Sequence, residues 1–188
     1  QSSMRILGGN YGAVTKTQEG LAVFAEFITG CIDVRRMRRI MNRVEAIQMA
    51  IDGADFIQVY RFFLERSRLK TEAFENARRI FRGGMMTGCA PFTKDVVYLD
   101  GLVRTHNFIR AVVSKGRNDV LELLFAGKME LDDMPTILEM KKEGMVKPPR
   151  YLPDWVLDKD YLVSYFALSI FIGEMDHQMT DEYYQGLF

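Results

Sequence analysis

The sequence predicts a mainly α-helical single domain of about six to eight helices, with little or no sheet. Apolar residues recur at helical spacing along most of the chain, whereas the alternation typical of half-buried strands is faint throughout. A chain of 188 residues, 48% of them apolar, suits one domain with a sizeable core. We expect this domain to span residues 1–175 and a C-terminal tail to follow over residues 176–188.

Two helices are predicted in the first quarter of the chain, after a glycine-rich lead-in. Thr15 and Gln18 have the form of a capping box for the first helix, which should end before Gly30. Asp33 is the expected N-cap of the second helix. Five arginines of the second helix should lie largely on its solvent side, opposite the apolar residues: Arg35, Arg36, Arg38, Arg39 and Arg43.

Two more helices and an irregular segment are expected next. The third helix, "ADFIQVYRFFLERSRL", is rich in Phe and Tyr, and Thr71 is the expected cap of the fourth. The glycine pair 83–84 should end the fourth helix. The segment "MMTGCAPFTKDVVYLDG" then breaks the helical rhythm through its glycines and Pro91.

The C-terminal half should return to helix. One helix is expected to enter around Asp95 and to run on, with an irregularity at Gly101. Two short helices follow, the second with Pro135 in its first turn. The proline-rich stretch "MVKPPRYLPDW" predicts an extended connector, and a last helix is expected over 160–172.

Charge and cysteine content narrow the classes of partner and compartment. Basic and acidic residues balance at 25 each, so the net charge gives no support for nucleic acid or for an anionic membrane as a partner. No apolar run is long enough to span a bilayer. Two cysteines without close spacing fit a reducing compartment, and we expect a cytoplasmic location.

The histidines, cysteines and methionines do not by their spacing alone predict a metal site or a catalytic site. The two histidines, His106 and His177, have no second ligand at helical spacing, so a packed role is expected for His106 and a solvated tail position for His177. Cys89 would need a nearby base to act as a nucleophile, and a structural role is favoured. The twelve methionines are expected to be core packing.

Two sequence blocks resemble a known family. The string "TQEGLAVFAEF" resembles the signature of the flavohaemoglobin-expression-modulating QEGLA-motif proteins, which in turn resemble the microtubule-associated tyrosine carboxypeptidases. A second block, "RIFRGGMMTGCAPFTKDVVYLDGL" at 79–102, looks like the other stretch that the family shares. The resemblance runs from about residue 2 to at least residue 175.

The resemblance implies a zinc-dependent peptidase-like domain. In that family an HExxxH helix supplies two histidine ligands and a catalytic Glu, and the Glu of the EGLA block supplies the third ligand. Carried over to this chain, the third ligand is Glu19, at the start of an otherwise apolar helix. Three protein ligands leave an open position for water, which suits catalytic zinc.

No HExxxH precedes Glu19 in this chain. We therefore expect the chain to be the C-terminal portion of a longer protein, inactive alone and without zinc, although descent from a protein that lost the helix is the other explanation. A removed N-terminal segment should leave an apolar patch at Leu21, Phe24 and their neighbours. Such a patch predicts self-association or poor solubility.

The second block offers candidate substrate contacts. Lys94 could hold the terminal carboxylate of a peptide or protein, and Arg79 and Arg82 are equal candidates. Tyr98, four residues after Lys94, could stabilise a developing oxyanion as a catalytic residue. A surface charge for Lys94 and a packed aromatic role for Tyr98 remain open. If the site exists, Glu19, Lys94 and Tyr98 should converge to within roughly 10–12 Å, the span of a small peptide.

A second function class remains open. The arginine-rich second helix and the Phe-rich third helix could dock a protein partner in a non-catalytic regulatory module. An HExxxH in the reading frame before Gln1 would favour the enzyme, and its absence would favour the module.

Overall fold

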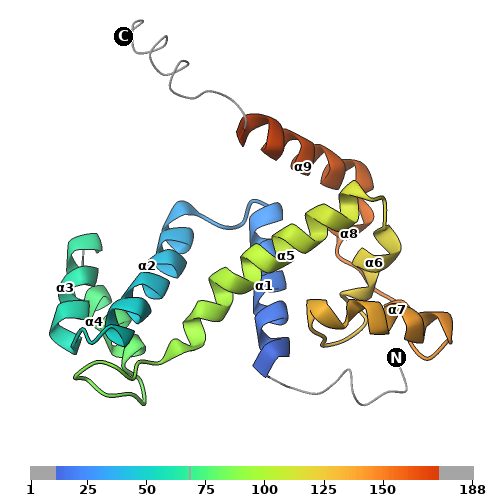
Figure 1. Cartoon of the computed structure of the whole chain (residues 1–188). Coiled ribbons are helices and arrows are strands. Elements are labelled where there is room, and N and C mark those ends of the chain that lie inside the picture. The colour runs from blue at the N-terminus through green and yellow to red at the C-terminus, as the bar shows by residue number, and fades with distance from the viewer. Residues whose placement is uncertain (1–11, 68, 174–188) are drawn as a thin grey trace, which may run out of the picture.

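The computed structural model describes residues 12–67 and 69–173, and all regular structure in these ranges is helical (Figure 1). The predicted mainly α class is confirmed, while the 176–188 tail and His177 lie outside the described residues. None of the described helices is long and apolar enough to cross a membrane. The elements are α1 (Gly12–Ile28), α2 (Val34–Ile51), α3 (Phe56–Arg66), α4 (Lys70–Ile80), η2 (Thr93–Asp95), α5 (Val96–Ser114), α6 (Asn118–Leu123), η3 (Leu131–Asp133), α7 (Met134–Lys142), α8 (Asp154–Leu157) and α9 (Lys159–Gly173).

Helix starts follow the local capping signals only in part. Asp33 caps α2 as predicted, its carboxylate accepting from the Arg36 N–H at 2.5 Å. α1 begins at Gly12, so Thr15 lies inside the helix and is not its cap. Thr71 is not the cap of α4 either, because that helix starts at Lys70 without a side-chain cap. The proline-rich connector contains the short helix α8 near its end.

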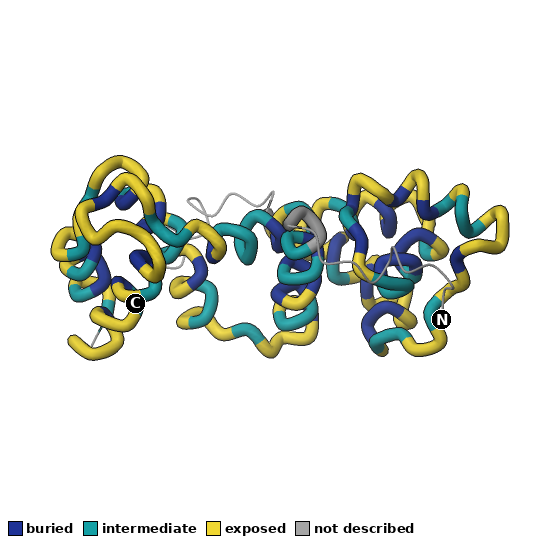
Figure 2. Tube along the Cα trace, turned by 90° about the horizontal axis from the view of Figure 1, so that it is seen from below, coloured by how far each residue is buried: buried dark blue, intermediate teal, exposed yellow. Residues whose placement is uncertain are grey.

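The apolar residues form two cores, visible as two groups of buried residues in Figure 2. The larger core joins α1 and α5 to α6–α9, and the smaller core lies between the second half of α2, α3 and α4. α2 contributes to both, since Ile40 belongs to the larger core and Ile47 to the smaller one. In Figure 1, α1 and α5 cross in the middle, with α2–α4 on one side, α6–α8 on the other and α9 above the crossing.

α1 and α5 cross at a pair of glycines. A Cβ added to Gly20 would lie 2.2 Å from the backbone of Gly101, and one added to Gly101 would lie 2.3 Å from the Lys16 carbonyl oxygen. Only glycine permits backbones to approach this closely. The predicted irregularity at Gly101 is wrong, because α5 runs unbroken through it. Glycine at position 101 allows α1 and α5 to cross at this short distance.

Leu21 and Phe24 are buried, so the apolar patch predicted at these residues is wrong. The exposed fraction is 9% for Leu21 and 0% for Phe24. The Phe24 ring packs edge to face on Trp155, with ring centroids 5.5 Å apart, and stacks near Phe166. Helices α5, α8 and α9 of the same chain supply this cover.

We therefore expect any self-association to use another surface, the exposed apolar side chains of α9. This helix is apolar on all sides, and several of its large side chains are exposed: Val163, Leu168, Ile170, Phe171 and Ile172. An apolar patch of this kind favours association in water. We expect sedimentation at micromolar concentration to show oligomers that the double variant Leu168→Glu, Phe171→Glu dissociates. A monomeric parent chain would contradict this expectation.

The loop after α4 holds Cys89 in a left-handed conformation. Its φ is +67°, a region that costs a non-glycine residue about 1 kcal/mol or more. The side chain is exposed, and the backbone N–H donates to the Ala50 carbonyl oxygen at 2.7 Å. We expect Cys89→Gly to raise the free energy of unfolding by about 0.5–1 kcal/mol in urea titrations. Cys89→Ala should change it little, and a less stable glycine variant would contradict the prediction.

Candidate functional site

Glu19 lies at the crossing of α1 and α5. It directly precedes Gly20, and its side chain is half-buried. One turn earlier, Lys16 forms an ion pair with Asp100 of α5 at 2.5 Å. Two turns later, Glu26 pairs with Arg36 of α2. Residues at these spacings share one side of a helix, so Glu19 lies between two interhelical ion pairs. Its own carboxylate forms no ion pair within the part of the chain that the structure describes.

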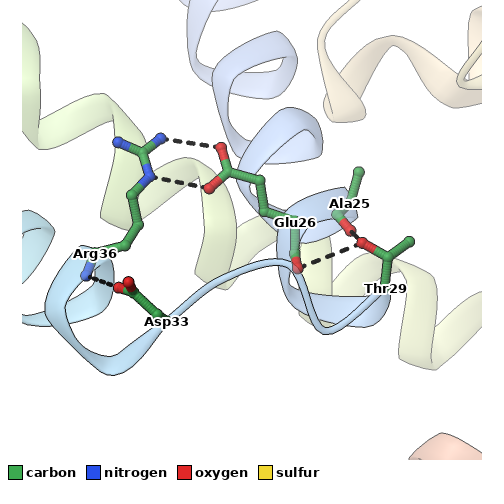
Figure 3. A network of polar contacts seen from close by, with 5 residues as sticks. All are labelled: Ala25, Glu26, Thr29, Asp33 and Arg36. Carbon is green, nitrogen blue, oxygen red and sulfur yellow. Dashed lines mark hydrogen bonds and ion pairs between the residues drawn. The ribbon is translucent and has the colours of Figure 1, made fainter.

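The pair between Glu26 and Arg36 fixes the turn from α1 to α2 (Figure 3). The Arg36 Nε and Nη2 donate to the two carboxylate oxygens at 2.9 and 3.0 Å. The hydrogen bond from Arg36 lowers the pKa of Glu26, although partial burial acts in the opposite direction. Asp33 caps the backbone of the same arginine, so the start of α2 is held at two points.

A buried carboxylate, Asp95, joins α2, α4 and the start of α5. Its side chain is 1% exposed. Arg79 of α4 binds it in bidentate fashion, with Nε at 2.5 Å and Nη2 at 3.0 Å. Arg43 of α2 lies farther away, with Nη1 3.5 Å from the Asp95 Oδ2. This ion-pair cluster lies where the two cores meet.

The predicted solvent side of α2 is wrong for two of the five arginines. Arg36 and Arg43 alternate with Ile40 and Ile47 along the inward side of the helix, at spacings of three and four residues. They turn inward because each finds a carboxylate there. The remaining three arginines are exposed as predicted: Arg35, Arg38 and Arg39. The spacing relative to the apolar stripe was the available signal for this cluster, but assigning arginine to solvent by residue type hid it.

Tyr98 lies between the two ion-pair clusters. Its half-buried ring packs against the larger core. Arg36 and Arg79 both lie within electrostatic reach of its hydroxyl group. The residue is therefore a packed aromatic with two cations within electrostatic reach of its hydroxyl group.

Lys94 and Arg82 line one cavity of about 490 Å³ beside the start of α5. The Arg82 guanidinium stacks over the Phe92 ring at 4.7 Å, and Phe92 also lines the cavity. Lys94 is exposed. Arg79 is not among the lining residues, because its guanidinium is bound to Asp95.

The site residues lie along the path from η2 into α5. Lys94 lies in η2, directly before α5, and Tyr98 and Gly101 follow within α5, with Tyr98 three residues before Gly101. Gly101 meets Gly20, so Glu19 lies at the far end of this path. This order brings the three site residues into one region, and the convergence of their functional groups stays a prediction.

His106 and Cys89 are not brought together. The His106 ring packs against Phe166 and Phe24, with centroids 5.3 and 6.2 Å apart, in agreement with a packed role. Cys89 lies in the loop against the end of α2, beside the smaller core. No group of three His, Cys, Asp or Glu side chains within the described ranges could hold a metal ion.

A family model for the microtubule-associated tyrosine carboxypeptidase matches residues 1–174. The chain belongs to this family. Comparison with curated proteins and with solved structures found no match. In this member of the microtubule-associated tyrosine carboxypeptidase family, the two blocks singled out in the sequence meet in space, since Gly20 and Gly101 form the crossing of α1 and α5.

Proposed function

We propose that this chain forms part of a zinc-dependent, carboxypeptidase-like catalytic site, with Glu19 as one metal ligand. The observation that carries the proposal is the family match over residues 1–174 together with the position of Glu19 between two ion pairs. Burial makes the charged form of a carboxylate less stable, and a cation placed against the carboxylate stabilises that charged form.

The described residues alone do not fit a zinc centre, since they contain no three grouped ligands. We propose that histidines of an HExxxH segment, outside this sequence, join Glu19 in the whole protein. By this proposal the chain alone supplies the third ligand and part of the substrate cleft, and it neither binds zinc tightly nor hydrolyses peptides.

The chain's own residues would bind and orient the C-terminus of a peptide or protein. Lys94 and Arg82 present two cations to a cavity that also has an aromatic wall, which suits a carboxylate next to an apolar side chain. Arg79 is the weaker candidate of the three, because Asp95 already occupies its guanidinium. The Tyr98 hydroxyl is proposed to donate a hydrogen bond to the oxygen on which negative charge develops.

An assay of residue release from a peptide C-terminus tests this function. The protein would be the whole polypeptide with an HExxxH segment ahead of this chain, and the probe a peptide with a free or an amidated C-terminus. We expect Lys94→Gln to raise KM about tenfold for the free acid, the value of one charge-assisted contact. Lys128→Gln, a change at an exposed lysine outside the cavity, should leave KM unchanged. Equal KM values for the Lys94→Gln and Lys128→Gln variants would contradict the assigned role.

Metal analysis of the isolated chain gives a second prediction. One carboxylate holds zinc weakly compared with two histidines and a glutamate. After dialysis we expect well below one equivalent of zinc per chain. A tightly bound equivalent would mean that other side chains complete a site within this chain.

A non-catalytic interaction module remains the alternative proposal. The exposed arginines Arg35, Arg38 and Arg39 favour an acidic protein partner. Phe62 and Phe63 of α3 are buried in the smaller core, however, so the Phe-rich helix offers less docking surface than its sequence suggests. The narrower membership in the flavohaemoglobin-expression-modulating group and a cytoplasmic location are likewise proposals.

A further inference from the structure

The junction between the two cores carries an excess of positive charge. Arg36, Arg43 and Arg79 meet there with the carboxylates of Glu26 and Asp95, and Asp33 also lies within electrostatic reach of Arg36. Arg39, one turn along α2, lies within electrostatic reach of Arg43. Four guanidinium groups thus gather around three acids, and two of these acids, Glu26 and Asp95, are each bound in bidentate fashion by one of the four arginines.

Arg43 is the least satisfied member of this group. Its Nη1 is 3.5 Å from Asp95, and its Nη2 donates to the Asn76 side chain at 3.4 Å, both long contacts. Its Nε is buried and has no acceptor. Burial lowers the pKa of Arg43, Asp95 opposes this, and the neighbouring arginines lower the pKa further. A guanidinium in this position is stabilised by any additional anion.

We propose that Arg36, Arg39 and Arg43, with the Tyr98 hydroxyl, form a binding site for a small oxyanion, either a carboxylate or a phosphate. The side chains of Arg43 and Arg36 remain 19% and 36% exposed, so solvent reaches part of each side chain, although the Arg43 Nε is buried. Guanidinium groups match such anions through paired N–H donors, and a phenol adds one more.

This site shares Tyr98 with the proposed catalytic site, but it lies outside the cavity of Lys94 and Arg82, whose lining includes none of the four residues. It also needs no metal and no other part of the protein. It can therefore be tested on the isolated chain, and its failure would leave the proposed peptidase function untouched.

The test is an NMR titration of the ¹⁵N-labelled chain with inorganic phosphate, at ionic strength held constant with chloride. We expect saturable shifts at the amides of α2 and of the start of α5. Arg39→Gln should weaken binding about tenfold, because it removes one charge-assisted contact. Arg38→Gln, at an exposed position that points about 100° away from Arg39 and about 140° away from Arg43 around α2, is the matched control and should change binding less than twofold. Arg43→Gln should abolish binding, and Arg39→Gln decides the matter if that variant fails to fold.

A second arm separates the two sources of the anion. An N-acetylated dipeptide with a free C-terminus should compete with phosphate if the site takes peptide carboxylates, and its amidated form should not. Competition by neither peptide identifies phosphate as the ligand. The proposal is overturned if phosphate causes no saturable shifts, if Arg38→Gln and Arg39→Gln weaken binding equally, or if the shifts centre on residues 82–94.

Discussion

Gly101→Ala is expected to lower the free energy of unfolding by about 3 kcal/mol or more, the upper range for overpacking a rigid contact. The added methyl group would lie 2.3 Å from the Lys16 carbonyl oxygen, and neither helix backbone can move away without disturbing the larger core. Urea unfolding followed by circular dichroism measures the change.

The control for this variant is Gly30→Ala. Gly30 has a φ of +70° and open space around it, so alanine there costs only the backbone preference, about 1 kcal/mol. If Gly101→Ala is no more destabilising than Gly30→Ala, the crossing of α1 and α5 is not as close as described.

Asp95→Asn is expected to lower the free energy of unfolding by about 3 kcal/mol, because it removes a buried negative charge. The carboxylate is 1% exposed and compensates Arg79 and Arg43, so asparagine would leave two cations without a counter-charge at the junction of the cores. Partial exposure of Arg79 keeps the value at the lower end of the range for buried pairs.

Glu139→Gln is the matched control, because it breaks the exposed pair with Lys142. We expect Glu139→Gln to change the free energy of unfolding by no more than about 0.5 kcal/mol. A loss below about 1 kcal/mol in Asp95→Asn would show that the buried carboxylate is not what joins α2, α4 and α5.

Residue spacing predicted the helices well, because burial of one apolar side is a property of each segment alone. The N-cap at Asp33 was also predictable, since capping is local. Thr15 and Thr71 failed as caps, although they carry the same signal. Packing contributes to the boundary of α1, because Lys16 contacts α5 within the turn that Thr15 was expected to cap.

The sequence indicated the candidate site residues, but it did not indicate which of them contact one another in the folded chain. The EGLA block drew attention to Glu19, but nothing local indicates that the next residue, Gly20, meets Gly101. The spacing along α2 indicates only that Arg43 lies on the inward side of the helix, and its pairing with Asp95 escaped prediction because the two residues come from distant segments. Arginine is a surface residue by default, and only the tertiary structure shows where it is not.

The central claim, that Glu19 is a zinc ligand, is tested most directly by the zinc content, after dialysis, of a polypeptide in which the proposed HExxxH segment precedes this chain. We predict one equivalent for the parent protein and for the control Glu143→Gln, at an exposed position in this chain, and a loss of most of the metal in Glu19→Gln. Full zinc occupancy and unchanged affinity in Glu19→Gln would contradict the account.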